Sequence, residues 1–249
     1  MNPELPEIAR EISALPEREP FWGYGDLALF VGAALPALVL AVVLLRFASL
    51  VWPRVLGAAN AKTLAVQVLA YLFLLAALYA VVAWKYHKPF WASLGWGRAV
   101  PNVFPLLAAG PVLAIGLASL GVALGLPAEP SQIEFLITSR AWLVVWMLVG
   151  VLLAPMFEET VFRGFLLPLF ARGVGPWLGI IMTAIPFGLL HGAQNHWAWQ
   201  PVVLIGLAGA AFGWVRQKTG STAAAFLLHA AYNAAEFGLY AWTRWAALK

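Results

Sequence analysis

The sequence has 249 residues, of which 63% are hydrophobic and only 10% are charged, and its formal net charge is +4. A soluble globular domain has about 45–50% apolar and about 25% charged residues, so this composition excludes a disordered chain, a nucleic-acid-binding domain and an ordinary soluble enzyme. It is typical of a polytopic membrane protein that is surrounded by lipids and has no nucleic-acid partner.

The first 26 residues are acidic, with five glutamates against two arginines before Phe21. This charge sign is wrong for the n-region of a signal peptide. Ile8, Ile12 and Leu15 recur at roughly helical spacing, which predicts a short helix on the membrane surface, although a frayed acidic tail fits equally well. We expect residues 1–26 to form an interfacial segment and residues 27–249 to form a single transmembrane domain.

Apolar runs long enough to cross a bilayer follow one another along the chain. A spanning helix needs about 20 such residues, and seven runs reach or approach that length: 27–45, 64–84, 103–124, 141–157, 177–190, 201–215 and 222–242. We expect Pro155 to kink the fourth helix, with residues 161–170 as an eighth, shorter element. The fold class predicted is an all-α transmembrane bundle of seven or eight spans.

Positive residues in the connections favour a cytoplasmic N-terminus. The side of the membrane on which each connection after residue 157 lies depends on whether there are seven or eight spans, so the orientation of the C-terminal half stays open. We expect an integral membrane protein, located in the plasma membrane of a prokaryote. Its oligomeric state is open.

Ionisable side chains at membrane depth are costly, so they usually have a partner or a task. Glu159 and Arg163 are four residues apart, so on a helix they share a face and can form an ion pair. Glu158 lies about 100° around the helix from Glu159. The spacing predicts a paired Glu159 and a free Glu158 that faces a cavity and can act as a general base. Alternatively, both acids only neutralise Arg163.

Two later helices carry histidines. Phe187 precedes His191 by one turn at the end of an apolar helix, and His229 precedes Asn233 by one turn on the last helix. Each group has a structural alternative, because His and Asn also hold neighbouring helices together. A carboxylate, two imidazoles and a carboxamide are nevertheless the parts needed to activate water and to stabilise the oxyanion in amide hydrolysis.

The motifs EExxxR (Glu158, Glu159, Arg163), FxxxH (Phe187, His191) and HxxxN (His229, Asn233) occur in this order. The sequence thereby resembles the CPBP family, also called Abi or CAAX-processing intramembrane endopeptidases, which includes the type II CAAX prenyl proteases. The resemblance covers a catalytic core of about residues 141–238.

The resemblance implies an eight-helix bundle with a membrane-embedded active-site cavity, which hydrolyses a peptide bond of a membrane-associated or lipidated protein. It assigns water activation to Glu158 and His191, oxyanion stabilisation to His229 and Asn233, and supporting roles to Glu159, Arg163 and Phe187. A mechanism that depends on glutamate and uses no cofactor is favoured. The alternative is a metalloprotease with zinc bound by Glu158, His191 and His229.

The sequence lacks the catalytic residues that other protease classes require. The GYGD sequence before the first span contains Asp26, the only aspartate in the chain, so an aspartyl dyad is excluded. The chain also has no cysteine, which excludes disulfides, a thiol nucleophile and cysteine-ligated zinc. A proton-coupled transporter and a non-catalytic membrane interaction protein stay as alternatives. Substrate identity, including prenylation, and the roles of His196 and Glu236 stay open.

Overall fold

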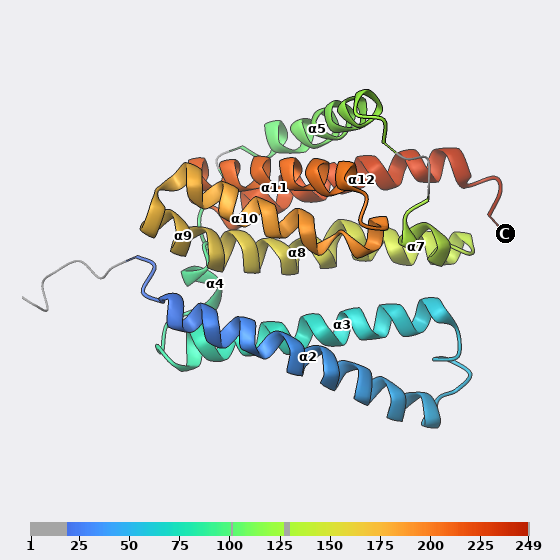
Figure 1. Ribbon diagram of the computed structural model, residues 1–249, viewed down its shortest axis with the longest axis horizontal. Coiled ribbons are helices and arrows are strands. Elements are labelled where there is room, and N and C mark those ends of the chain that lie inside the picture. Colours follow the sequence, from blue (N-terminus) through green and yellow to red (C-terminus); the bar gives the residue numbers. More distant parts are fainter. Residues whose placement is uncertain (1–18, 101, 127–129, 249) are drawn as a thin grey trace, which may run out of the picture.

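The computed structural model describes residues 19–100, 102–126 and 130–248, which form helices and no strand (Figure 1). The surface helix expected around Ile8, Ile12 and Leu15 lies outside the described residues. The elements are α2 (Tyr24–Val51), α3 (Ala59–Tyr79), η1 (Ala80–Trp84), α4 (Phe90–Ser93), α5 (Val103–Ala123), α6 (Gln132–Leu136), α7 (Arg140–Leu148), η2 (Val149–Leu153), α8 (Ala154–Glu159), η3 (Thr160–Leu166), α9 (Leu167–Val174), α10 (Pro176–Leu190), η4 (Ala193–Asn195), α11 (Trp199–Thr219) and α12 (Thr222–Arg244).

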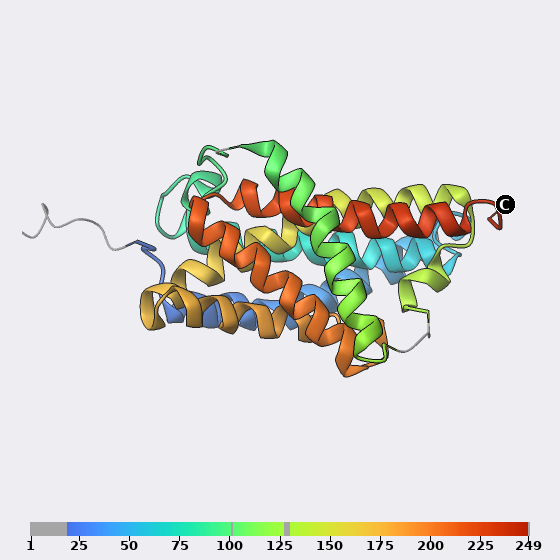
Figure 2. The same ribbon diagram turned by 90° about the horizontal axis from the view of Figure 1, so that it is seen from above.

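The helices are arranged around the segment that runs from α7 to α9. On one side of this segment lies a hairpin of α2 and α3, and on the other side lie α10, α11 and α12 (Figure 1). Helix α5 crosses α12 obliquely on the outside of the bundle (Figure 2). At this crossing a Cβ on Gly110 would stand 2.6 Å from the backbone of Ala231, so the two helices pack backbone to backbone.

Four helices are long and apolar enough to cross a bilayer: Tyr24–Val51, Ala59–Trp84, Val103–Ala123 and Arg140–Val174. Large apolar side chains face outward on them, for example Leu35 at 69% and Val122 at 81% exposure, as expected of surfaces that contact lipid. The all-α membrane bundle predicted from the sequence is confirmed. Helix α10 is apolar but shorter, and α12 carries the polar residues His229, Asn233 and Glu236, so spans at α10 to α12 stay a prediction.

The separate eighth element expected after Pro155, at residues 161–170, is wrong. Residues Arg140–Val174 form one continuous helical segment. The π-helical turn η2 ends at Leu153, and the Ala154 N–H donates to the Val149 carbonyl. Pro155 is the second residue of α8 and directly follows this turn, so the helix continues through a residue that has no backbone N–H to donate.

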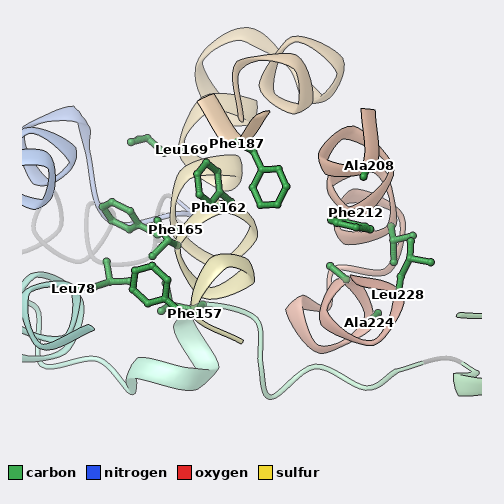
Figure 3. Close-up of a cluster of buried hydrophobic side chains, with 14 of the residues drawn as sticks. Leu78, Phe157, Phe162, Phe165, Leu169, Phe187, Ala208, Phe212, Ala224 and Leu228 are labelled. Atoms are coloured by element: carbon green, nitrogen blue, oxygen red, sulfur yellow. The ribbon is translucent and has the colours of Figure 1, made fainter. Parts of the chain in front are cut away.

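An aromatic core fixes the central helix against its neighbours. Phe157, Phe162 and Phe165 lie on the central segment, with Phe187 and Phe212 on facing helices (Figure 3). All five side chains are at most 8% exposed. A second π-helical turn of the central segment, η3, begins directly after the acidic pair Glu158–Glu159.

Candidate functional site

Glu158 and Glu159 are the last two residues of α8, and their side chains enter different surroundings. The side chain of Glu159 is completely buried, whereas that of Glu158 is 15% exposed and lines a cavity. Neighbouring residues on a helix point about 100° apart, which explains the difference. The division between a paired and a free carboxylate is the one that the spacing predicts.

Arg163 is fully buried, and its guanidinium is held by two hydrogen bonds and by neighbouring aromatic rings. Its Nη1 donates to Glu159 Oε1 at 2.8 Å, and its Nη2 donates to the carbonyl of Gly209 on α11 at 2.6 Å. The guanidinium carbon also lies 4.6 Å from the centroid of the Phe187 ring, within range of a cation–π interaction. These contacts offset the cost of burying a charge, which is tolerated only when the charge is paired and hydrogen-bonded.

His229 is oriented by the same buried carboxylate. Its Nδ1 lies 2.8 Å from Glu159 Oε1, and because an ionised carboxylate can only accept, Nδ1 carries the hydrogen. The Nε2 atom then points toward Glu158, with a separation of 3.8 Å from Oε2. The Phe212 ring stacks on the imidazole at 4.3 Å and 18°, which fixes the plane of the ring.

His191 follows the last residue of α10 and has the same tautomer. Its Nδ1 lies 2.8 Å from the carbonyl oxygen of Phe187, and since a carbonyl only accepts, Nδ1 is again the donor. Its Nε2 lies 4.0 Å from Glu158 Oε1. Two imidazoles from different helices therefore present their Nε2 atoms to one carboxylate.

Asn233 lies one turn after His229 and faces the same cavity. Its Nδ2 donates one hydrogen bond to the carbonyl of Gly150 in the π-helical turn η2, at 2.7 Å. A carboxamide nitrogen carries two hydrogens, so the second N–H is not used by this bond. Glu158, His191, His229 and Asn233, which lie far apart in the sequence, line one cavity of about 630 Å³ whose wall is mainly apolar.

Glu236 and His196, whose roles the sequence leaves open, lie in different surroundings. Glu236 also lines the cavity and accepts a hydrogen bond from the hydroxyl of Tyr232 at 2.6 Å. His196 lies in the loop after α10, where its Nε2 is 3.2 Å from the carbonyl of Pro130. Glu236 is thus part of the cavity wall, while His196 contacts the segment before α6.

Sequence reasoning missed the contribution of α3. Gln67 and Tyr71 line the same cavity, and the Gln67 Nε2 donates to the Tyr71 hydroxyl at 3.0 Å. No motif spacing links α3 to the acidic pair, which begins 87 residues after Tyr71. A polar Gln67 inside an otherwise apolar run was the available signal.

The zinc alternative requires a set of side chains that surrounds one metal position. Among the residues that the structure describes, no group of three or more His, Cys, Asp or Glu side chains could hold a metal ion. Glu158, His191 and His229 therefore do not form a ready-made zinc site. Metal dependence stays a prediction, which chelation tests.

Comparison with known proteins finds similarity in the segment that holds this site. Residues 140–235 match the family described as type II CAAX prenyl endopeptidase Rce1-like. An uncharacterized 24.3 kDa protein of Escherichia coli is 34% identical over 128 residues, which are 50% of this chain and 58% of that relative. The chain thus covers less than two thirds of this relative's length. No solved structure matches the chain significantly. The segment matched by the family contains Glu158, His191, His229 and Asn233.

Proposed function

We propose that this chain, whose residues 140–235 match the Rce1-like family of type II CAAX prenyl endopeptidases, is an intramembrane endopeptidase with Glu158 as its general base. The chain is an integral membrane protein of the CAAX-protease type. One observation supports Glu158 as the general base: its carboxylate faces the Nε2 atoms of His191 and His229 at 4.0 and 3.8 Å inside a largely apolar cavity.

The tautomers of the two histidines support separate roles. With Nδ1–H bonded to Phe187, neutral His191 has a lone pair at Nε2 and can accept a hydrogen from a water molecule beside Glu158. Glu158 takes the other proton as the water oxygen attacks the carbonyl carbon of the peptide bond. General bases contribute about 10²–10⁴-fold to such reactions.

His229 can donate to an oxyanion only as an imidazolium, because its Nδ1–H is already used. The Glu159 carboxylate at 2.8 Å stabilises that charged form. In the proposed reaction His229 Nε2–H and the second N–H of Asn233 stabilise the negative oxygen of the tetrahedral intermediate. Glu158 then gives its proton to the leaving nitrogen as the C–N bond breaks, which restores the carboxylate.

The cavity walls support a substrate that reaches the site from the membrane. Most of the residues around the cavity are apolar, so a membrane-associated peptide or a lipidated protein is the proposed substrate class. The plasma membrane of a prokaryote is the proposed location, with membrane lipids as the surrounding partners.

The function is tested with purified protein in liposomes and a panel of membrane-inserted peptides, with and without a C-terminal lipid. We expect wild-type protein to cleave part of the panel and Glu158→Gln to lose about 10²–10⁴-fold in rate. The control Glu19→Gln removes an exposed carboxylate outside the cavity and should cleave normally.

Cleavage by Glu158→Gln at the wild-type rate would overturn the assignment of the base. A wild-type protein that cleaves no peptide but conducts protons in a Glu158-dependent manner would instead favour the transporter alternative.

A further inference from the structure

Helix α3 contributes a tyrosine to the cavity from outside the segment matched by the family. Tyr71 stacks in parallel on Phe157, with 4.1 Å between ring centroids and 15° between planes. Phe157 directly precedes Glu158 in α8. The stacking therefore holds the α3 side chain beside the free carboxylate, and Tyr71 and Glu158 line the same cavity.

The hydrogen bond from Gln67 fixes which way the Tyr71 hydroxyl donates. An amide nitrogen can only donate, so the hydroxyl oxygen is the acceptor in the 3.0 Å bond from Gln67 Nε2. The hydroxyl proton is then available for another acceptor. The carboxylate of Glu158, which lines the same cavity, is an acceptor that this proton can serve.

Glu158 needs such a donor. The Nε2 atoms of His191 and His229 lie 4.0 and 3.8 Å from the carboxylate, which is beyond hydrogen-bond distance, so neither imidazole holds it in place. Arg163 also attracts Glu158 electrostatically, but its hydrogen bonds go to Glu159 and Gly209. The oriented hydroxyl comes from α3, a helix that carries neither histidine.

We propose that Tyr71 is a positioning residue, whose hydroxyl donates to the Glu158 carboxylate and holds it between the two imidazoles, while Gln67 orients that hydroxyl. Its importance for catalysis rests on the proposed function. The inference also means that residues 140–235 do not make up the whole site, because the α2–α3 hairpin supplies part of it.

The contact is tested without any substrate. Dicyclohexylcarbodiimide modifies protonated carboxyl groups in apolar surroundings, and mass spectrometry measures its attachment to Glu158 as a function of pH. A donor stabilises the charged form of a carboxylate, so its loss should favour the protonated form. We expect the labelling midpoint of Tyr71→Phe to lie about one pH unit above that of wild type.

Matched variants separate the hydroxyl from general effects. Tyr79→Phe removes a hydroxyl from the same helix at a side chain that is 54% exposed, and it should give the wild-type curve. Gln67→Leu leaves Tyr71 intact but unoriented, and we expect a smaller shift in the same direction. Tyr71→Phe keeps the ring and its stacking, and thermal unfolding checks that it is folded.

Superimposable labelling curves for wild type, Tyr71→Phe and Gln67→Leu would overturn the inference, even if the protein proves to be a peptidase. If the curve of Tyr71→Phe is shifted from that of wild type but wild type cleaves no peptide, the contact is supported and the proposed function is overturned. Once a cleaved peptide is known, Tyr71→Phe should lower kcat about tenfold with KM nearly unchanged.

Discussion

Removing the charge of Arg163 should leave the buried Glu159 carboxylate without its arginine partner and held only by the hydrogen bond with His229. Both side chains are fully buried and 2.8 Å apart, and breaking a buried pair by removing one partner costs about 3–5 kcal/mol. For a protein of this size each kcal/mol corresponds to about 2–4 °C. Arg163→Met should therefore unfold about 6–20 °C below wild type.

Thermal unfolding in detergent or nanodiscs measures this cost, and a double-mutant cycle assigns it to the pair. Glu159→Gln alone leaves the guanidinium without its carboxylate, although the amide oxygen can still accept from His229. In the double variant Glu159→Gln/Arg163→Met both charges are gone, so we expect a loss well below the sum of the two single losses. Arg46→Met, at an exposed position on α2, is the control and should change little. Strictly additive losses would refute the reasoning.

Three further predictions concern close packing and metal. Gly209→Ala would place a Cβ 2.8 Å from the Phe187 ring, so it should lower both the melting temperature and the rate of peptide cleavage. In the control Gly213→Ala the nearest neighbour of the new Cβ is at 3.5 Å, so both quantities should change little. Equal effects of the two substitutions would contradict this account. Gly110→Ala should destabilise the protein at the α5–α12 crossing, while Gly116→Ala, with no atom within 4 Å, should be neutral or slightly stabilising in the same unfolding assay. EDTA or phenanthroline should leave peptide cleavage unchanged, and a loss that zinc restores would show that the metal-free mechanism is wrong.

Local periodicity is sufficient to predict the helical bundle and much of the motif geometry. The four helices that are long and apolar enough to cross a bilayer each contain one of the apolar runs, because a chain in lipid must satisfy its backbone hydrogen bonds within each helix. The Glu159–Arg163 ion pair follows from an i, i+4 spacing. The catalytic roles of Glu158, His191, His229 and Asn233 stay predictions that the measured separations support.

Features that depend on the exact register of the backbone were not predictable. Pro155 was expected to kink the fourth helix and to separate an eighth element from it, but the helix continues through Pro155 after a π-helical turn. The carbonyl of Gly209 accepts a hydrogen bond from Arg163. Every residue has a backbone carbonyl, so no sequence pattern indicates which one on another helix is the acceptor. The approach of Tyr71 to Glu158 depends on how the α2–α3 hairpin packs, which no local pattern determines.

The most direct test of the central claim follows oxygen during a single turnover in water enriched in a heavy oxygen isotope. If Glu158 acts as a base on water, the new carboxyl group of the product carries the heavy isotope and the side chain of Glu158 carries none. Heavy oxygen in the Glu158 carboxylate after turnover would show that it attacks the substrate itself and would contradict the account.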